Sequence, residues 1–235
     1  MLNNSFFITS TGTNIGKTYC TVEIIKALIK KKIEVNPFKP ILSGFNLKKI
    51  EECDSYKILS AKKNNIDIKD IKSITPWLFN NAIAPSLAAE KENKNLDYNQ
   101  VFNWCLDKIN YRNKKKSINI IEGAGGILVP IEKEKTILDL IIGLRLPVIL
   151  VVGNYLGSVS HTLSVVKNIQ FSKLNIINII INQNNDCDID IDDTKKLIDT
   201  NLTNKIITRK IYKESNYQSE EIQLITKDIL NYFQC

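Results

Sequence analysis

Short apolar runs alternate with longer segments of helical periodicity along the chain. The runs 148–152 and 176–181 contain almost no polar residue, which is typical of strands buried on both faces of a parallel sheet. In segment 17–31 the apolar positions fall on roughly one face, which favours an amphipathic helix. The pattern therefore predicts strands and helices in regular alternation.

We expect strands at residues 5–10, 33–38, 117–122, 147–153, 175–182 and, with a weaker pattern, 205–209. We expect helices at residues 17–31, 55–63, 98–110, 158–171, 192–200 and 219–232. This order predicts the α/β class, as a doubly wound, mostly parallel sheet flanked by helices in a single domain over residues 1–235. Ligands of such folds bind outside the carboxyl ends of the strands.

Segment 10–18, Ser-Thr-Gly-Thr-Asn-Ile-Gly-Lys-Thr, lies between the first expected strand and the first expected helix. That context is typical of a phosphate-binding loop, although Thr11 stands where the standard pattern has glycine. Backbone N–H groups and the helix N-terminus attract phosphate, Lys17 reaches the β- and γ-phosphates, and the Thr18 hydroxyl binds Mg²⁺. The alternative is a chance Gly-Lys-Thr at a helix start. We prefer the first interpretation and predict the P-loop NTPase class.

Three further side chains follow expected strand ends or open a helix. Lys39 leaves the second strand and would neutralise charge on a transferring phosphoryl group, unless it is an ordinary surface lysine. Glu122 ends an apolar strand before the Gly-rich run 123–126, where P-loop enzymes place a Mg²⁺-binding carboxylate. The alternative there is a flexible turn. Asp54 is a plausible second carboxylate, or simply an acidic helix start.

Two weaker candidates lie at the ends of the expected strands 147–153 and 175–182. Segment 154–161 opens a helix whose N–H groups would hold a carboxylate, while Ser158 as a plain N-cap fits equally well. For His161, the chain's one histidine, packing or capping is the preferred interpretation. Asn182 can read a base edge through its amide or cap a turn.

The chain has a formal net charge of +7 and a pI near 9.0, but its lysines are scattered. The densest run, 112–116, we interpret as a solvated loop, and no basic stripe interleaved with aromatics predicts a nucleic-acid partner. The five cysteines form no C-x-x-C pair, which favours a reducing compartment over a disulfide framework or zinc site. With no signal peptide and no apolar stretch of about 20 residues, we expect a cytoplasmic protein without a membrane partner.

Taken together, the motifs resemble those of the dethiobiotin synthetase family, with the pattern G-T-x-T-x-V-G-K-T, K-P-x-x-S-G, an early Asp, E-G-A-G-G and L-P-V-I-L-V-V-G-x-x-L-G-x-x-x-H. The matching segments are 11–18, 39–44, Asp54, 122–126 and 146–161. The resemblance implies that ATP, as co-substrate with Mg²⁺, drives carboxylation of 7,8-diaminononanoate by CO₂ and closure of a ureido ring. It also implies a homodimer.

The resemblance assigns roles residue by residue. Lys17 and Lys39 would be catalytic, and Thr18, Asp54 and Glu122 would hold Mg²⁺. Ser43, Gly157 and Ser158 would bind the substrate, the last two across the dimer interface. The nucleotide would be bound by Thr13, Asn14, Ile15, Gly16, Lys17, Thr18, Tyr19, Asp54, Glu122, Gly123, Ala124, Gly125, Asn182, Gln183, Tyr212, Lys213 and Glu214.

The chain departs from the family pattern at several places. Ser10 replaces the usual leading glycine, Gly12 replaces a common aspartate, and segment 209–214 lacks the usual proline. The main alternative is a P-loop switch ATPase of the partitioning or septum-positioning type, which usually carries a lysine that positions 10–12 lack. Segment 219–235 also does not read as a basic membrane helix. A synthetase half of an amidotransferase, which needs a glutaminase domain, and a non-enzymatic nucleotide-binding module are further alternatives.

Overall fold

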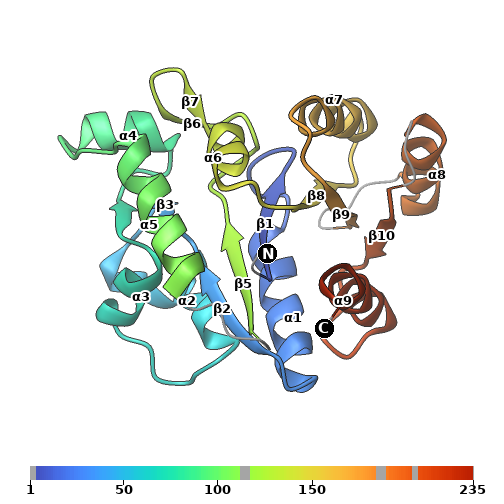
Figure 1. Cartoon of the computed structure of the whole chain (residues 1–235), viewed down its shortest axis with the longest axis horizontal. Helices are drawn as coiled ribbons and strands as arrows, with labels where there is room; N and C mark the ends of the chain where they lie inside the picture. Colours follow the sequence, from blue (N-terminus) through green and yellow to red (C-terminus); the bar gives the residue numbers. More distant parts are fainter. Residues whose placement is uncertain (1–3, 112–116, 184–188, 203–205, 235) are drawn as a thin grey trace.

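A central sheet of six parallel strands organises the computed structural model, which describes residues 4–111, 117–183, 189–202 and 206–234. The strand order is β10-β9-β8-β1-β5-β2, and Figure 1 shows it from β2 on the left to β10 on the right. The strands are β1 (Ser5–Ser10), β2 (Glu34–Phe38), β5 (Ser117–Glu122), β8 (Val148–Gly153), β9 (Ile176–Asn182) and β10 (Thr208–Ile211).

The chain winds away from β1 in both directions. It passes to β2, returns to β5 beside β1, and then continues through β8, β9 and β10 on the other side. All neighbouring strands of this sheet are parallel. The doubly wound parallel sheet expected from the sequence is therefore confirmed, and its switch point lies at the carboxyl end of β1.

Helices pack against each other in groups along the sheet. α1 (Lys17–Lys30) contacts both α2 (Asp54–Ser60) and α9 (Glu220–Phe233). α5 (Tyr98–Tyr111) contacts α6 (Ile137–Leu144), and α7 (Ser158–Phe171) contacts α8 (Ile191–Asn201). Every residue of β1, β5 and β8 is buried, as expected of strands covered on both faces.

The expected elements match closely, except that two of them are clearly shifted and several others were not predicted. α2 ends at Ser60 rather than at residue 63. β1, β5 and α7 have the expected bounds, whereas the sixth strand lies at Thr208–Ile211 rather than 205–209. Lys205 and the basic run 112–116 lie outside the described residues. The elements that the sequence pattern did not predict are β3 (Ile41–Ser43), η1 (Leu47–Glu52), α3 (Ile68–Ile74), β4 (Trp77–Phe79), α4 (Pro85–Lys91), β6 (Pro130–Glu132), β7 (Lys135–Thr136) and α6.

The missed helix α6 has a clear local signature. Thr136 accepts from the backbone N–H of Asp139, and the Asp139 carboxylate accepts from the backbone N–H of Thr136, which makes a capping box. Because α6 is mostly apolar, its periodicity is weak and the sequence pattern did not distinguish it from a buried strand.

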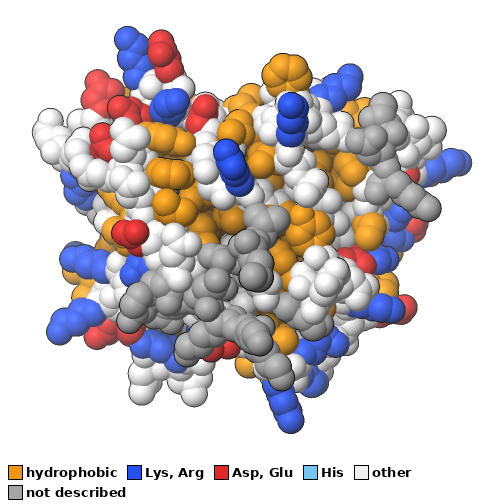
Figure 2. All heavy atoms as spheres, viewed as in Figure 1, with side chains coloured by type: hydrophobic (Ala, Val, Ile, Leu, Met, Phe, Trp, Pro, Cys, Tyr) orange, Lys and Arg blue, Asp and Glu red, His pale blue; other side chains and the backbone are white. Residues whose placement is uncertain are grey.

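The surface and the thiols agree with a globular chain. On the face in Figure 2, Lys and Arg side chains are interspersed with acidic ones around the rim, without a single basic patch among the described residues. Cys20, Cys53 and Cys105 are free and buried, and Cys187 and Cys235 lie outside the described residues. In the described part of the chain, no helix is both long and apolar enough to cross a membrane.

Candidate active site

The phosphate loop joins the end of β1 to the start of α1. Its last residue before the helix, Gly16, has φ 93°, a left-handed conformation that side chains rarely adopt. A Cβ atom at Gly16 would lie 2.1 Å from Nδ2 of Asn182, which donates to the backbone oxygen of Ile15 at 3.0 Å. The loop therefore needs glycine at this position, both for its backbone conformation and for the close approach of Asn182.

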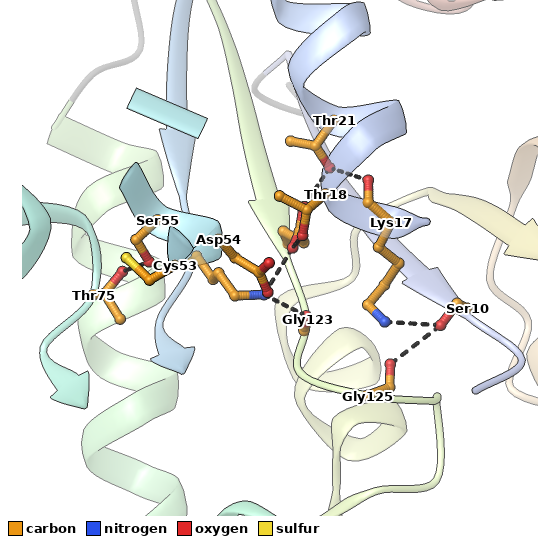
Figure 3. Close-up of polar contacts among 12 residues, drawn as sticks. Ser10, Lys17, Thr18, Thr21, Cys53, Asp54, Ser55, Thr75, Gly123 and Gly125 are labelled. Carbon is orange, nitrogen blue, oxygen red and sulfur yellow. Dashed lines mark hydrogen bonds and ion pairs between the residues drawn. The ribbon is translucent and has the colours of Figure 1, made fainter. Parts of the chain in front are cut away.

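Lys17 lies folded against this loop. Its Nζ donates to Oγ of Ser10 at 2.9 Å and to the oxygen of Gly12 at 3.3 Å, and Figure 3 shows the contact with Ser10. Burial and the nearby Lys39 lower the pKa of Lys17 to about 8, although Glu122 opposes the shift. An ammonium has three N–H donors, so Lys17 retains one for a ligand in the adjoining cavity.

Lys39 is buried at the end of β2, so the interpretation as a surface lysine is wrong. Its Nζ lies 2.7 Å from Oε1 of Glu122, 3.2 Å from Oδ2 of Asp54 and 3.4 Å from the oxygen of Gly123. Burial lowers the pKa of Lys39, but the two carboxylates outweigh it and raise the pKa above its ordinary value. Lys39 is therefore a charged ammonium at neutral pH inside the site.

Glu122 is fully buried at the end of β5 and has donors on both carboxylate oxygens. Oε1 accepts from Oγ1 of Thr18 at 2.7 Å, and Oε2 accepts from Oγ1 of Thr21 at 2.5 Å. The sequence interpretation missed Thr21, although its position three residues after Thr18 puts both hydroxyls on one helix face. The alternative interpretation of this segment as a plain flexible turn does not account for Glu122, because hydroxyl groups of α1 hold its carboxylate.

Asp54, the first residue of α2, faces the same cluster (Figure 3). Burial raises the pKa of this carboxyl, but Lys39 and a hydrogen bond from Thr18 outweigh it and hold the pKa below its usual range. Asp54 is therefore ionised at neutral pH. The carboxylates of Asp54 and Glu122 therefore share this cluster with the ammonium groups of Lys39 and Lys17, and their oxygen atoms are the groups in it that could bind a cation.

The donor set fits Mg²⁺ rather than a softer metal. Thr18, Asp54 and Glu122 offer oxygen atoms alone, and Mg²⁺ prefers oxygen ligands and keeps several from water or phosphate. The described residues contain no group of three or more His, Cys, Asp or Glu side chains that could hold a metal by themselves. A metal site that is shared between these side chains and the nucleotide phosphates agrees with the oxygen-only donors and with the lack of such a group among the described residues.

A cavity of about 690 Å³ opens beside these side chains. Ser43, at the end of β3, lines it, and its buried Oγ has no hydrogen-bond partner in the described part of the chain. The loop 82–85 also lines the cavity, which the sequence interpretation did not foresee. The expected site residues that line it are Thr13, Asn14, Ile15, Gly16, Lys17, Thr18, Tyr19, Lys39, Ser43, Asp54, Ala124 and Gly125.

The remaining expected residues lie outside the cavity lining. The backbone N–H of Gln183 donates to the oxygen of Ile211, and that of Tyr212 donates to Oγ of Ser215. The expected residues not among the lining are Glu122, Gly123, Asn182, Gln183, Tyr212, Lys213, Glu214, Gly157 and Ser158. The first three contact lining residues directly.

The loop after β10 nevertheless lies beside the first two turns of α1, the helix that follows the phosphate loop. The carboxylate of Glu214, after burial and Glu23, contributes to the raised pKa of Tyr19, which lies in the first turn of α1. The backbone N–H of Tyr217 donates to Oε2 of Glu23 at 2.6 Å. Gly157 and Ser158 begin α7, where Ser158 is buried and the φ of Gly157 is 93°.

Comparison with known structures supports the fold. The septum site-determining protein MinD of Pyrococcus horikoshii, solved with Mg-ADP, aligns with a TM-score of 0.55 and 14% identity, over 97% of this chain and 96% of that chain. A ParA family ATPase of Chlorobium tepidum aligns with a TM-score of 0.51 and 18% identity, over 98% and 92%. At these identities the likeness shows the P-loop NTPase fold alone.

Sequence relatives are more specific. A family model described as an AAA domain matches residues 4–217. ATP-dependent dethiobiotin synthetase BioD of Phenylobacterium zucineum is 33% identical over 77% of this chain and 76% of its own length. The enzyme of the same name from Caulobacter vibrioides (strain NA1000 / CB15N) is 31% identical over 83% and 86%. With the motifs and the site geometry described above, these matches show that the chain belongs to the dethiobiotin synthetase family.

Proposed function

We propose that this chain uses ATP to convert 7,8-diaminononanoate (7,8-diaminopelargonate) and CO₂ into dethiobiotin, ADP and phosphate. The names of its relatives support this reaction. The observation that carries it is the cavity lined by the phosphate loop, Lys39, Asp54 and Ser43, whose buried Oγ has no hydrogen-bond partner among the described residues. A nucleotide-binding loop alone would serve any ATPase, whereas the second lysine and the free hydroxyl provide for a second, charged substrate.

The chemistry runs in three steps. One substrate amine adds to CO₂ and loses a proton to give a carbamate. A carbamate oxygen then attacks the γ-phosphorus of ATP, which releases ADP and leaves a mixed anhydride. The second amine attacks the carbonyl carbon, phosphate departs, and the five-membered urea closes. Negative charge gathers on the carbamate and the transferring phosphoryl group, so Lys17 and Lys39 act by electrostatic stabilisation.

Thr18, Asp54 and Glu122 would hold Mg²⁺, which when bound neutralises charge on the phosphate oxygens. Before any ligand binds, Lys39 lies between the two carboxylates and prevents them from repelling each other. Ser43 would hydrogen-bond the substrate near its amines, because it lines the cavity and its buried Oγ has no partner among the residues that the structure describes. A buried hydroxyl without a partner is costly and is satisfied by a polar ligand.

Asn182 would recognise adenine. Its amide gives one N–H to Ile15 and retains a second N–H and an oxygen, which match the donor and acceptor on the adenine edge. Gln183 and the loop of Tyr212, Lys213 and Glu214 would flank the base.

The N-terminus of α7 at Gly157 and Ser158 would bind the substrate carboxylate in a homodimer. We further propose a single domain over residues 1–235 and a cytoplasmic location, with no nucleic-acid or membrane partner.

The test is phosphate release with ATP and Mg²⁺, with and without diaminononanoate and bicarbonate. We expect release that depends on the diamine, with one dethiobiotin formed per phosphate. Lys17→Ala should weaken ATP binding as well as turnover, since Lys17 faces the phosphates. Release that ignores the diamine would favour the switch-ATPase alternative, which the fold comparisons support only as far as the fold.

A further inference from the structure

Thr21 makes a contact with Glu122 that the roles assigned above do not use. Oε1 of Glu122 is shared by Thr18 and Lys39, whereas the hydrogen bond to Oε2 comes from Oγ1 of Thr21 at 2.5 Å. Both Thr21 and Glu122 are almost completely buried, at 1% and 0% exposure. No water replaces a lost donor easily at such a position, so this contact holds one end of the carboxylate.

The ordinary explanation for a helical threonine is a hydrogen bond to the carbonyl four residues earlier. Thr21 Oγ1 does lie 3.0 Å from the oxygen of Lys17, but a hydroxyl has one proton, and the carboxylate is closer and charged. Thr226 in α9 shows the ordinary case, with Oγ1 2.8 Å from the oxygen of Ile222. The orientation of Thr21 toward Glu122 is therefore more than helix self-bonding.

A carboxylate that is held at only one oxygen can rotate about its last side-chain bond. With Oε2 fixed by Thr21, Oε1 is directed at Thr18 and Lys39, which come from α1 and β2 (Figure 3 shows Thr18 and Thr21 on the same helix). We propose that Thr21 is a positioning residue, whose hydroxyl fixes the Glu122 carboxylate in the orientation that serves Mg²⁺–ATP and Lys39. This inference rests on the role proposed for Glu122 in metal binding.

The experiment compares Thr21→Val, which keeps the shape and removes the donor, with Thr21→Ser, which keeps the hydroxyl. We expect Thr21→Val to weaken binding of a fluorescent ATP analogue about 10-fold when Mg²⁺ is present, the scale typical for partners of metal ligands. Binding in EDTA should change little, because the phosphate loop is untouched. Thr21→Ser should restore most of the Mg²⁺-dependent affinity and, in the turnover assay, most of kcat.

Thr226→Val is the matched control, because it removes the same hydroxyl from another buried helical threonine far along the chain. It should leave the Mg²⁺ dependence unchanged. Thr21→Ala replaces Thr21→Val if the valine variant does not fold by circular dichroism. The inference is overturned if the donor-free variant keeps the wild-type Mg²⁺ dependence, or if Thr21→Ser is as impaired as Thr21→Val.

The same measurements separate this inference from the proposed function. If wild-type protein releases no phosphate in response to the diamine, the proposed reaction fails. The Mg²⁺ dependence of nucleotide binding in the Thr21 variants is then still measurable, and it decides the positioning role independently.

Discussion

The phosphate side of the site and the side expected to hold the base and the substrate carboxylate are built differently. On the phosphate side, Lys17, Lys39 and Glu122 are buried and hydrogen-bonded to neighbours from β1, β2 and α1. On the other side, Lys213 and Glu214 are exposed and Gly157 begins a helix at the surface. The phosphate side is held by buried, hydrogen-bonded ions, whereas the other side combines the buried Asn182 at the end of β9 with an exposed loop and a helix end.

The difference follows from the cost of burying charge. An ionised side chain inside a protein needs charged or hydrogen-bonding partners, and here each buried ion has them. Base and carboxylate recognition needs only amide groups and helix N–H donors, which a surface loop can provide. We therefore expect substitutions on the phosphate side to affect turnover, and those on the other side to affect specificity.

The largest expected effect comes from Lys39→Ala. Its ammonium meets its reacting partner in the transition state, so kcat should fall by about 10²–10³-fold, the scale for loss of one preorganised electrostatic group. ATP affinity should stay within a few-fold of wild type, because Lys17 and the loop remain. Steady-state phosphate release and nucleotide titration measure the two effects separately.

Lys48→Ala is the matched control, since Lys48 is an exposed lysine in η1, close to Lys39 in sequence. It should match wild type in both assays. A Lys39→Ala enzyme that turns over at the full rate would contradict a catalytic role for Lys39. It would show that this lysine only holds the structure of the phosphate side.

A smaller effect is expected on the base side. Asn182→Ala removes the amide that we assign to adenine, and should weaken ATP binding by about 10-fold, the loss expected from one or two hydrogen bonds. GTP binding should weaken much less, since GTP presents a different edge. Competition between ATP and GTP for a fluorescent nucleotide measures the ratio. An equal loss for both nucleotides would assign Asn182 only to bracing the phosphate loop through Ile15.

Much of the fold was accessible from the sequence because its signals are local. The apolar runs of β1 and β5 gave their bounds, and turns after each strand located the carboxyl ends. The sequence interpretation missed β3, β4, β6 and β7 because two- and three-residue strands carry no readable period. β3 pairs with β4 across more than thirty residues, which no local pattern reveals, whereas β6 and β7 form a short antiparallel hairpin with each other.

For the site, the sequence predicted which residue types gather at strand ends but not how they pair. Lys39 and Glu122 were both expected near the phosphates, yet only their burial shows that each stabilises the charge of the other. Thr21 was missed because a threonine inside a helix carries no distinctive signal. Loop 82–85 reaches the cavity by tertiary packing, which periodicity does not reveal.

A pH titration of ATP binding tests the phosphate side of the site without any substitution, through the protonation of Lys17. In the free protein, burial and Lys39 lower the pKa of Lys17 to about 8, and a bound phosphate raises it again. The terminal phosphate of ATP, whose second pKa is about 6, stays ionised from neutral pH upward, which is the range of this titration. Binding above pH 8 therefore takes up a proton, and affinity should fall by up to ~10-fold per pH unit as pH rises, while below pH 8 it should be flat.

Calorimetry in two buffers of different ionisation enthalpy measures the proton uptake directly. Glu122 and Asp54 face Lys17 and oppose the depression of its pKa, and Cys20, whose own pKa is raised by burial, stays a neutral thiol. An affinity that is constant from about pH 7 to about pH 9.5, on both sides of the pKa of about 8, would show that Lys17 keeps its charge in the free protein.

The smallest expected effect tests a feature peculiar to this phosphate loop. Ser10 stands where the family usually has glycine, and its hydroxyl accepts from Lys17 and donates toward the oxygen of Gly12. Ser10→Ala removes that acceptor and keeps the Cβ, so the KM for ATP should rise by about 3- to 10-fold, the net worth of one ordinary hydrogen bond. Ser60→Ala, at an exposed serine that bonds only its own helix, is the control.

Because Gly12 still accepts from Lys17, kcat should change less than KM. An unchanged KM would mean that Lys17 is positioned by the backbone alone, and that the serine is a neutral replacement.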